Sequence, residues 1–169
     1  MVSIITVNFN SLDVTCEMLR SVRNFGGHDI EVVVVDNGSD EDPGQYLKNH
    51  FPEVKYVRSE RNLGFAGGNN LGIKASKGDF LFFLNNDAEL TKGAIETLLA
   101  LFSTHSGIGI ASPKICYHNA RPGSEPDVIQ YVGNTHVHPL TARNSTIGAG
   151  EVDNGQYQTA QPTAYAHGA

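Results

Sequence analysis

The sequence contains no tryptophan, only two cysteines and no hydrophobic run long enough to cross a membrane. Cys16 and Cys116 lack the spacing of a metal site and allow at most one disulfide, so a reduced, cytoplasmic protein is expected. A membrane-spanning helix needs about 18 consecutive apolar residues, and no run here approaches that length. The N-terminus enters a strand-like segment directly, without a basic signal region. These features predict a chain with no transmembrane segment.

Positive charge is also scarce. Twelve Lys and Arg residues face 18 Asp and Glu residues, which leaves a formal net charge of -6. Non-specific binding to nucleic acid depends on clustered Lys and Arg that neutralise phosphates, so no nucleic-acid partner is expected. With 169 residues, of which 40% are hydrophobic, the chain can bury one sizeable core.

The most informative segment is the apolar run of residues 80–84, which stops at Asn85-Asn86-Asp87. An apolar run without alternation is typical of a strand covered on both faces, as in a parallel sheet. Open α/β sheets bind ligands beyond the carboxyl ends of their strands, which places Asp87 where a ligand is expected. A carboxylate flanked by amide oxygens suits Mg²⁺ or Mn²⁺. The same tripeptide is also ordinary turn and helix-capping chemistry, and alone it does not decide between the two.

Two further strands are expected to end in polar residues. The β-branched residues 32–35 lead into Asp36-Asn37, and residues 2–7 lead into Asn8-Phe9-Asn10-Ser11. The three strand ends are predicted to form one polar rim at the edge of the sheet. We therefore expect Asp36 and Asp87 to line the same cleft.

Along the chain, predicted strands and helices alternate. The predicted helices span residues 12–25, 42–48, 65–77 and 91–105, and Thr91 is the expected N-cap of the last one. Further strands are predicted at residues 30–35, 54–57 and 79–84. This order predicts an α/β fold with a mostly parallel sheet covered on both sides.

The last third of the chain has a different character. Short strands are expected at residues 108–111 and 115–117, whereas residues 119–127 and 141–162 are rich in Gly, Pro, Asn, Ser and Gln. Long loops in a compact domain commonly serve binding, so these are predicted to be mobile acceptor-side loops. The expected division is a donor-binding core at residues 1–105 and an acceptor-side part at residues 106–169.

Four segments, in this order and spacing, resemble glycosyltransferase family 2 of the GT-A fold. Residues 2–10 resemble the opening strand of the family, and Asp36-Asn37-Gly38-Ser39 resembles the Asp-Asp-Gly-Ser that ends another strand. Residues 62–72 resemble the linking loop and helix, and Leu84-Asn85-Asn86-Asp87 occupies the place of the Asp-x-Asp metal motif. Residues 148–169 are similar, less closely, to the segment before the acceptor site in rhamnosyltransferase-like members.

The resemblance implies a three-layer, Rossmann-like GT-A fold of nucleotide-diphospho-sugar transferases, with a mostly parallel central sheet. The activity implied is an inverting glycosyl transfer from a UDP-, dTDP- or GDP-sugar. The implied acceptor is a glycan, a cell-surface polysaccharide or a lipid-linked molecule. The implied location is the cytoplasm, at the inner face of the membrane.

The resemblance also implies roles for single residues. Phe9 matches the aromatic position that stacks on uracil or thymine, and Asp36 and Asn37 match the pair that reads the base and ribose. Asp87 is the implied ligand of Mg²⁺ or Mn²⁺; Asn85, which replaces the first Asp of the motif and removes a charge, is a weaker ligand, as is His167. The candidate donor-binding residues are Phe9, Asn10, Asp36, Asn37, Asn62, Gly64, Asn69, Asn70, Asn85, Asn86 and Asp87.

The loop of residues 62–72 combines glycines and asparagines before a helix, so backbone N–H groups and the helix N-terminus can approach a phosphate. It has neither the Lys-Ser/Thr ending of a P-loop nor the spacing of the dinucleotide-binding fingerprint. The family often has a basic residue where Asn69 stands. Arg58 and Arg61 are the candidates to provide that charge here.

The catalytic base of the family, usually an Asp, is expected downstream of the segment that residues 164–169 resemble, and therefore beyond Ala169. Glu151 and Asp153 precede that position in a Gly-rich loop and are interpreted as solvated turn residues. The chain is therefore expected to be a truncated, donor-binding portion that transfers sugar poorly. Its exposed strand edge is expected to favour self-association.

Two other functions remain open. A nucleotidyltransferase would need a Gly-rich loop with Lys or Arg directly after the first strand, and Asn8-Phe9-Asn10-Ser11 has neither. A non-catalytic module that binds a nucleotide or glycan is compatible with the sequence.

Overall fold

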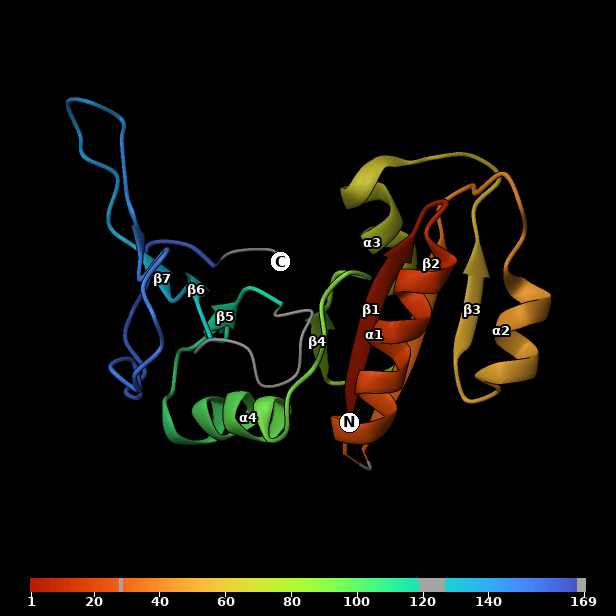
Figure 1. The fold of residues 1–169 in the computed structure, drawn as a ribbon, viewed down its shortest axis with the longest axis horizontal. Helices are drawn as coiled ribbons and strands as arrows, with labels where there is room; N and C mark the ends of the chain where they lie inside the picture. The colour runs from red at the N-terminus through yellow and green to blue at the C-terminus, as the bar shows by residue number, and fades with distance from the viewer. Residues whose placement is uncertain (28, 119–126, 167–169) are drawn as a thin grey trace. The chain divides into compact units, whose positions relative to one another are not determined.

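The computed structural model describes residues 1–27, 29–118 and 127–166 (Figure 1). They form two compact units, the first at residues 1–92 and the second beginning at Gly93. The boundary therefore lies before the helix at Ala94–Thr104, whereas the sequence placed it after residue 105. The assignment of donor and acceptor roles to the two parts stays a prediction.

A four-stranded parallel sheet forms the centre of the first unit. Its strands are β1 (Val2–Asn8), β2 (Ile30–Asp36), β3 (Lys55–Arg58) and β4 (Phe80–Phe83), in the order β3-β2-β1-β4 (Figure 1). All three neighbouring pairs are parallel, which confirms the predicted α/β fold with a parallel central sheet. The register pairs Asn8 with Asp36, so β1 and β2 end side by side.

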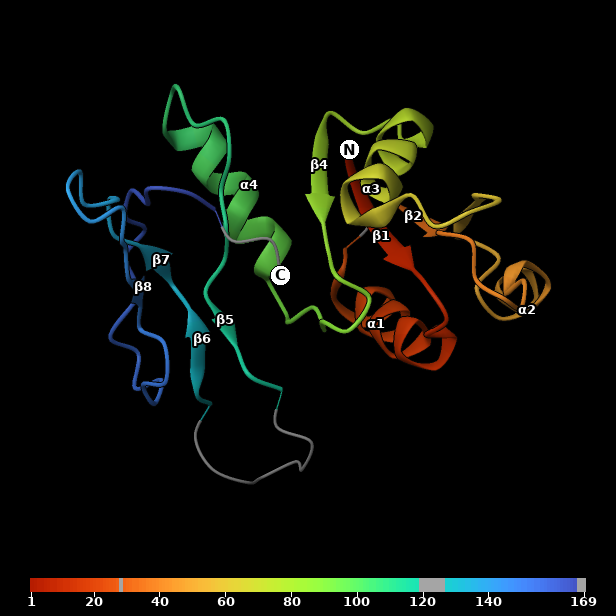
Figure 2. The same ribbon diagram turned by 90° about the horizontal axis from the view of Figure 1, so that it is seen from above.

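Helices cover both faces of this sheet. They are α1 (Leu12–Phe25), α2 (Gly44–His50) and α3 (Gly64–Ala75). Figure 2 shows α1 and α3 on opposite sides of β1, which gives the three layers expected from the sequence. The apolar residues Met18, Leu19 and Val22 of α1 are buried, as their helical spacing predicts.

Glycines allow α3 to approach the sheet closely. A Cβ atom on Gly68 would lie 2.8 Å from Cγ1 of Val7, and one on Gly72 would overlap Cγ2 of Ile5. Ile5 belongs to the fully buried cluster that also contains Val33 and Val35. This close packing holds the first turn of α3 near the carboxyl ends of β1 and β2.

The prediction that residues 80–84 form a strand covered on both faces is wrong. The strand exists as β4, but Phe80, Leu81 and Phe83 are 37%, 40% and 44% exposed. Within the described residues, β4 pairs with β1 alone and forms an edge of the sheet. The apolar composition therefore does not reflect burial on both faces here.

The second unit contains α4 (Ala94–Thr104) and two small antiparallel pairs. One pair joins β5 (Ile115–Cys116) to β6 (Ile129–Tyr131), and the other joins β7 (Gly133–Asn134) to β8 (Thr146–Ile147). The strand expected at residues 115–117 is confirmed, but residues 108–111 form none. Residues 119–126 of the predicted loop 119–127 lie outside the described residues.

Two further expectations for this part of the chain are corrected. Thr91 does not cap α4, because the N-cap is Gly93 in a left-handed conformation with φ of 80°. The predicted loop at residues 141–162 contains β8, and Val152 within it forms a bridge with Val128. Short backbone pairings, which a Gly-rich composition does not reveal, join this segment to other strands at two points, and its predicted mobility stays a prediction.

Neither cysteine takes part in a disulfide. Across residues 1–27, 29–118 and 127–166, no helix combines the length and apolar character that crossing a membrane requires.

Candidate functional site

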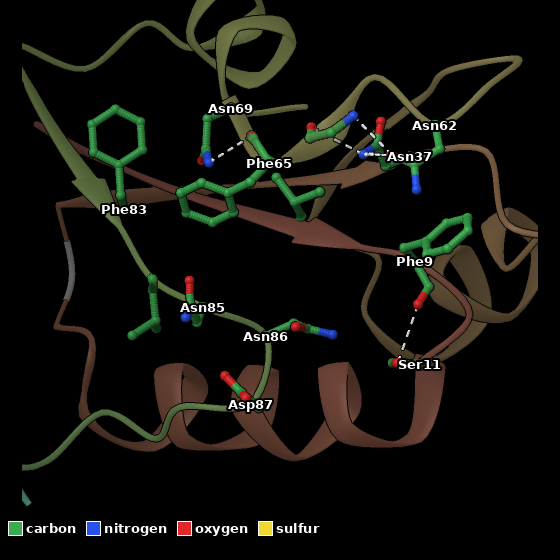
Figure 3. Close-up of a pocket in the computed structure, with 13 residues that line it drawn as sticks. Phe9, Ser11, Asn37, Asn62, Phe65, Asn69, Phe83, Asn85, Asn86 and Asp87 are labelled. Atoms are coloured by element: carbon green, nitrogen blue, oxygen red, sulfur yellow. Dashed lines mark hydrogen bonds between the residues drawn. The ribbon is translucent and has the colours of Figure 1, made fainter. Parts of the chain in front are cut away.

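A pocket of about 330 Å³ lies at the carboxyl ends of the strands of the first unit (Figure 3). Residues after β1, β2 and β4, together with the start of α3, form its walls. Of the residues expected to bind the donor, those that line it are Phe9, Asn37, Asn62, Gly64, Asn69, Asn85, Asn86 and Asp87. The structure therefore brings together residues from four separate segments, as the polar-rim hypothesis requires.

Several lining residues were not among the predicted ones: Val7, Ser11, Phe65, Phe83 and Leu84. Phe65 and Phe83 are 59% and 44% exposed, and Figure 3 shows both on the side of the pocket away from Phe9. The sequence signal for Phe65 was its place at the start of the α3 helix, between glycines. Phe83 carried no such signal, because it belongs to an apolar run that resembles core.

Phe9 offers an aromatic face to this pocket and is 44% exposed. The residues on either side of it are fixed. Asn8 is buried, and Asn10 adopts a left-handed conformation with φ of 52°, which is uncommon outside glycine. Asn10 exchanges two hydrogen bonds with Asp40, one from its Nδ2 to Oδ2 (3.2 Å) and one to its Oδ1 from the Asp40 N–H (2.9 Å). Phe9 is thus presented from a rigid turn.

Asn10 itself does not line the pocket, and its predicted part in donor binding stays a prediction. Its side chain is hydrogen-bonded to Asp40, and its backbone N–H donates to Oγ of Ser39 (2.9 Å). These contacts join the turn after β1 to the turn after β2.

Asn37 lines the pocket and at the same time fixes the loop that leads into α3. Its Nδ2 donates to Oδ1 of Asn62 (3.0 Å) and to the carbonyl of Gly64 (3.2 Å). Its Oδ1 accepts from the N–H of Leu63 (3.0 Å). A carboxylate could accept but could not donate these bonds, so asparagine suits this position.

The expectation that Asp36 and Asp87 line one cleft is wrong for Asp36. Its side chain is fully buried and does not line the pocket. Asp36 is the last residue of β2, and the next residue, Asn37, is the one that lines the pocket. Any part of Asp36 in donor binding would have to be indirect.

Of the two asparagines of α3, one lines the pocket and the other does not. Asn69 lines the pocket and donates from Nδ2 to the carbonyl of Phe65 (3.0 Å). Asn70 is exposed and lies outside the pocket, and its predicted part in donor binding stays a prediction.

The predictions at the end of the sequence are not tested by the structure. His167, the weaker candidate metal ligand, and Ala169, beyond which the catalytic base is expected, both lie outside the described residues. The position of the base beyond Ala169 therefore stays a prediction.

Asp87 is exposed, and it is the one acid among the described residues that line the pocket. Asn85 and Asn86 beside it are half-buried. The described part of the chain holds no group of three or more His, Cys, Asp and Glu side chains that could enclose a metal ion. One carboxylate with amide oxygens still fits Mg²⁺ or Mn²⁺, because these ions commonly keep several waters and share a substrate phosphate.

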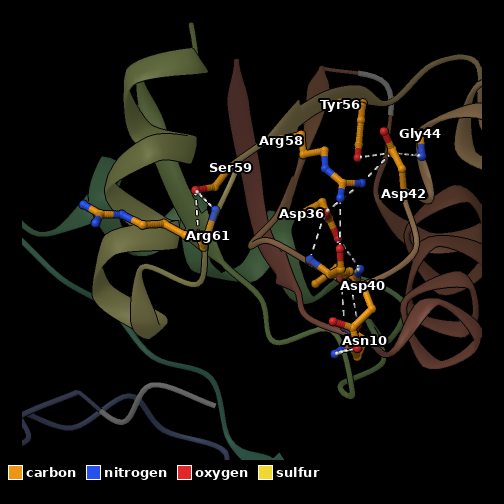
Figure 4. A network of polar contacts seen from close by, with 11 residues as sticks. Asn10, Asp36, Asp40, Asp42, Gly44, Tyr56, Arg58, Ser59 and Arg61 are labelled. Atoms are coloured by element: carbon orange, nitrogen blue, oxygen red, sulfur yellow. Dashed lines mark hydrogen bonds and ion pairs between the residues drawn. The ribbon is translucent and has the colours of Figure 1, made fainter.

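Arg58 is not available as a free cation for a phosphate. Its guanidinium lies 3.0 Å from Asp42 and 3.6 Å from Asp36, and it donates to the carbonyl of Ser39 at 2.9 Å (Figure 4). The hydroxyl of Tyr56, with the N–H of Gly44 and Arg58, lowers the pKa of Asp42. Arg61 is exposed and lies outside the pocket.

The two acids considered as alternative bases both have partners in the second unit. Asp153 forms an ion pair with Lys114, whose hydrogen bond lowers the pKa of Asp153. Glu151 accepts from the hydroxyl of Tyr157 at 3.0 Å. Both side chains are therefore engaged in contacts within the second unit, and Asp153, whose side chain is 15% exposed, is not the solvated residue expected from the sequence.

The first unit has an α/β fold with a parallel central sheet, and comparison of the sequence with known families identifies the family. The family model described as glycosyl transferase family 2 matches residues 3–148. The chain belongs to this family, and its α/β fold with a parallel central sheet is that of GT-A glycosyltransferases.

A characterised relative is the GalNAc(5)-diNAcBac-PP-undecaprenol beta-1,3-glucosyltransferase of Campylobacter jejuni. It is 31% identical over 101 residues, which cover 57% of this chain and 33% of that protein. The chain spans about a third of the length of the first curated relatives it matches.

Two solved structures show the same fold. Staphylococcus aureus TarS 1–349 in complex with UDP-GlcNAc matches with a TM-score of 0.55 and 24% identity, over 66% of this chain and 37% of that one. The mannosyltransferase PcManGT of Pyrobaculum calidifontis, in complex with GDP-Man and Mn²⁺, matches with a TM-score of 0.59 and 18% identity, over 68% of this chain and 35% of that one. At these identities the likeness establishes the fold alone.

Proposed function

We propose that this chain binds a nucleoside diphosphate sugar and belongs to an enzyme that transfers the sugar to a glycan or lipid-linked acceptor with inversion. The observation that carries the proposal is the pocket. An aromatic face, several amides and one exposed carboxylate, from separate segments, meet at the edge where open α/β sheets bind ligands. The C. jejuni relative is named as a glucosyltransferase acting on an undecaprenol-linked glycan, which supports an acceptor of this class.

Phe9 is the residue that would stack on the base of the nucleotide. It is exposed in the pocket and held by a rigid turn, so stacking would need little additional ordering. Asn62 and Asn69 line the same space with amide groups that can pair with the base or ribose edge, whereas the amide of Asn37 positions the loop before α3. These contacts are compatible with UDP-, dTDP- and GDP-sugars alike.

Asp87 and the oxygen of Asn85 are the groups that would hold Mg²⁺ or Mn²⁺. The bound ion would neutralise the diphosphate leaving group as the sugar carbon becomes positively charged. PcManGT, which shares the fold, is described with Mn²⁺, and this supports the assignment. Since Asn85 carries no charge, we expect weaker metal affinity than two carboxylates would give.

The protein's own part in the reaction is to bind and orient the donor. Asn37 fixes the loop before α3, so the first backbone N–H groups of α3 lie beside the pocket, where partial positive charge favours a phosphate. No residue is assigned as the catalytic base. The cytoplasmic location, at the inner face of the membrane, remains a proposal that suits a lipid-linked acceptor.

Thermal unfolding with a panel of ligands tests this function. UDP-, dTDP- and GDP-sugars would each be added with Mn²⁺, with Mg²⁺ and with a chelator. ATP would represent the nucleotidyltransferase alternative, and a free oligosaccharide would represent the binding-module alternative. A ligand at 100 times its dissociation constant stabilises the folded state by about 2.7 kcal/mol. We expect a metal-dependent rise in the midpoint with at least one nucleotide sugar. Stabilisation by free glycan or by ATP alone would favour the binding-module or nucleotidyltransferase alternative.

A further inference from the structure

Asp36 is a fully buried carboxylate that does not line the pocket. Its Oδ1 accepts from Nδ2 of Asn8 (2.9 Å) and from Oγ of Ser39 (2.5 Å), and its Oδ2 accepts from the N–H of Ser39 (3.2 Å). Arg58 lies 3.6 Å away and balances the charge (Figure 4). An ionised carboxylate only accepts hydrogen bonds, so each neighbour must turn a donor toward it.

This requirement fixes the orientation of the Asn8 carboxamide. The reversed amide would place a carbonyl oxygen 2.9 Å from the carboxylate oxygen of Asp36, which is repulsive. With Nδ2 toward Asp36, Oδ1 of Asn8 points to α1 and accepts from Oγ1 of Thr15 at 2.9 Å. Asn8 and Thr15 are 1% and 0% exposed, so water cannot substitute for either partner.

The hydroxyl of Thr15 continues this chain of hydrogen bonds to Asn86, the residue beside Asp87. Its hydroxyl has one proton, for which Oδ1 of Asn8 and the carbonyl of Ser11 (3.0 Å) are the acceptors. The hydroxyl oxygen can then only accept from Asn86, whose Nδ2 lies 3.1 Å away. Three hydrogen bonds, Asn86 to Thr15 to Asn8 to Asp36, thus run in one direction toward the buried charge.

A second hydroxyl of α1 fixes the other end of this segment. The N–H of Leu90 donates to Oγ of Ser21 (2.9 Å), and Ser21 donates to the carbonyl of Met18 (2.7 Å). Asp87 lies between the two anchor points, on the segment that crosses α1 in Figure 3. The backbone around the exposed carboxylate is therefore held from both sides.

We propose that Asp36 is a positioning residue that acts through Asn8 and Thr15 to orient the carboxamide of Asn86. Because Nδ2 of Asn86 is used by Thr15, its Oδ1 is the group left for the pocket beside Asp87. An oxygen there can accept from a water on a divalent cation or from a sugar hydroxyl, whereas an amide NH₂ would face the cation unfavourably. The proposal rests on the proposed function for the ligand and on the hydrogen bonds for the geometry.

The geometry can be tested by NMR without any ligand. In the wild-type chain, the side-chain NH₂ protons of Asn86 should show a nuclear Overhauser effect to the Thr15 methyl group and exchange slowly with water. Thr15→Val removes the hydroxyl and should shift these signals and speed their exchange. Thr15→Ser keeps the hydroxyl and should retain the wild-type exchange. Thr104→Val is the matched control, since its hydroxyl bonds within α4 to the carbonyl of Ala100.

The functional consequence is measured as the affinity for UDP, dTDP and GDP with Mn²⁺. Loss of the relay should weaken binding about tenfold, because the Asn86 oxygen is then no longer held toward the ligand. We expect this loss in Thr15→Val and in Asp36→Asn, whose amide can donate and so permits Asn8 to turn over. Thr15→Ser should bind within about twofold of the wild type.

The two parts of the test fail separately. Absence of the Asn86–Thr15 contact in the wild-type chain, or unchanged exchange in Thr15→Val, overturns the relay whatever the ligand. If the contact is present but Thr15→Val and Asp36→Asn bind like the wild type, the positioning role is overturned. A wild-type chain that binds none of the three diphosphates contradicts the proposed function, while the NMR result still decides the relay.

Discussion

At the scale of single residues, charge in the pocket is concentrated on one side chain. Asp87 is exposed and lies among amides and apolar groups, whereas Asp36, the other predicted acid, is buried. A single carboxylate binds a divalent ion weakly unless a phosphate shares the ion. Metal and nucleotide should therefore bind together, each raising the apparent affinity of the other.

Replacing Asp87 by Ala should remove the Mn²⁺-dependent part of nucleotide binding and leave folding nearly unchanged. The side chain is exposed at a strand end, where substitutions usually change stability by no more than about 0.5 kcal/mol. Isothermal titration with and without Mn²⁺ measures the first effect, and urea unfolding measures the second. Glu89→Ala, a nearby exposed acid outside the pocket, is the control and should bind like the wild type. Equal Mn²⁺-dependent affinity in Asp87→Ala would rule out this role.

Replacing Phe9 by Ala should weaken nucleotide binding even without metal. Stacking of a base on an aromatic side chain contributes about 1 to 3 kcal/mol, which corresponds to about five- to 150-fold in affinity. Phe9→Tyr, which keeps the ring, should retain most of the affinity. Phe25→Ala removes a similarly exposed ring, 41% against 44%, that lies outside the pocket and should change affinity little. If Phe9→Ala and Phe25→Ala bind alike, Phe9 does not stack on the base.

At the scale of elements, the site depends on how closely α3 packs on β1 and β2. Gly72→Ala gains about 1 kcal/mol of helix propensity, but the added methyl overlaps the fully buried Ile5. Overpacking in a core typically costs about 1 to 3 kcal/mol, so we expect net destabilisation in urea unfolding and displacement of the α3 N-terminus. Gly109→Ala, at a position with open space, should be neutral within about 0.5 kcal/mol. A neutral Gly72→Ala would show that the contact between helix and sheet is looser than described.

Elements with a clear local pattern are the ones that sequence predicts well. α1 spans Leu12–Phe25, as its apolar spacing indicates, and the parallel sheet follows from the alternation of strands and helices. β4 was located correctly, but its burial was not, because exposure depends on which strands and helices cover it. The cap of α4 was misplaced because Gly93 begins the helix without any side-chain hydrogen bond.

The sequence also predicts some features of the candidate site and not others. The sequence identified the strand ends, but it could not decide which of two neighbouring residues faces the ligand. Asp36 ends β2 and is fully buried, whereas Asn37, the first residue after the strand, lines the pocket, and this difference depends on tertiary packing. The hydrogen bonds between Asn10 and Asp40 were likewise not predicted from the sequence, since they join two turns that are distant in sequence.

At the scale of the first unit as a whole, a second polar cluster joins the strands at the edge opposite the pocket. Glu31 accepts from Oγ of Ser3 (2.5 Å) and from the N–H groups of Lys77 and Gly78. Burial acts to raise the pKa of Glu31, but these hydrogen bonds and the charge of Lys55 lower it below its ordinary value of 4.5. β1, β2 and the turn before β4 are thereby tied together.

This cluster predicts a pH dependence of stability. A lowered pKa stabilises the folded state above the ordinary value of 4.5, and the stabilisation is lost as the pH falls through the folded-state pKa. Glu31→Gln should therefore be less stable than the wild type near neutral pH and should lose less stability on acidification below 4.5. Urea unfolding from pH 7 to pH 3 measures both effects, with Glu60→Gln, an exposed glutamate, as the control. If the free energy of unfolding fell by the same amount in Glu31→Gln and in the wild type between pH 7 and pH 3, this account would be contradicted.

The central claim is that a nucleoside diphosphate and a divalent cation bind together in the pocket at Asp87. Paramagnetic broadening by Mn²⁺ tests it directly, because NMR signals close to the ion disappear. With UDP, dTDP or GDP present, substoichiometric Mn²⁺ should broaden the amide signals of Asn85, Asn86, Asp87 and the first turn of α3, and Mg²⁺ should leave them sharp. Broadening confined to other acids, such as Asp40 and Asp42, or unchanged by the nucleotide, would contradict the account.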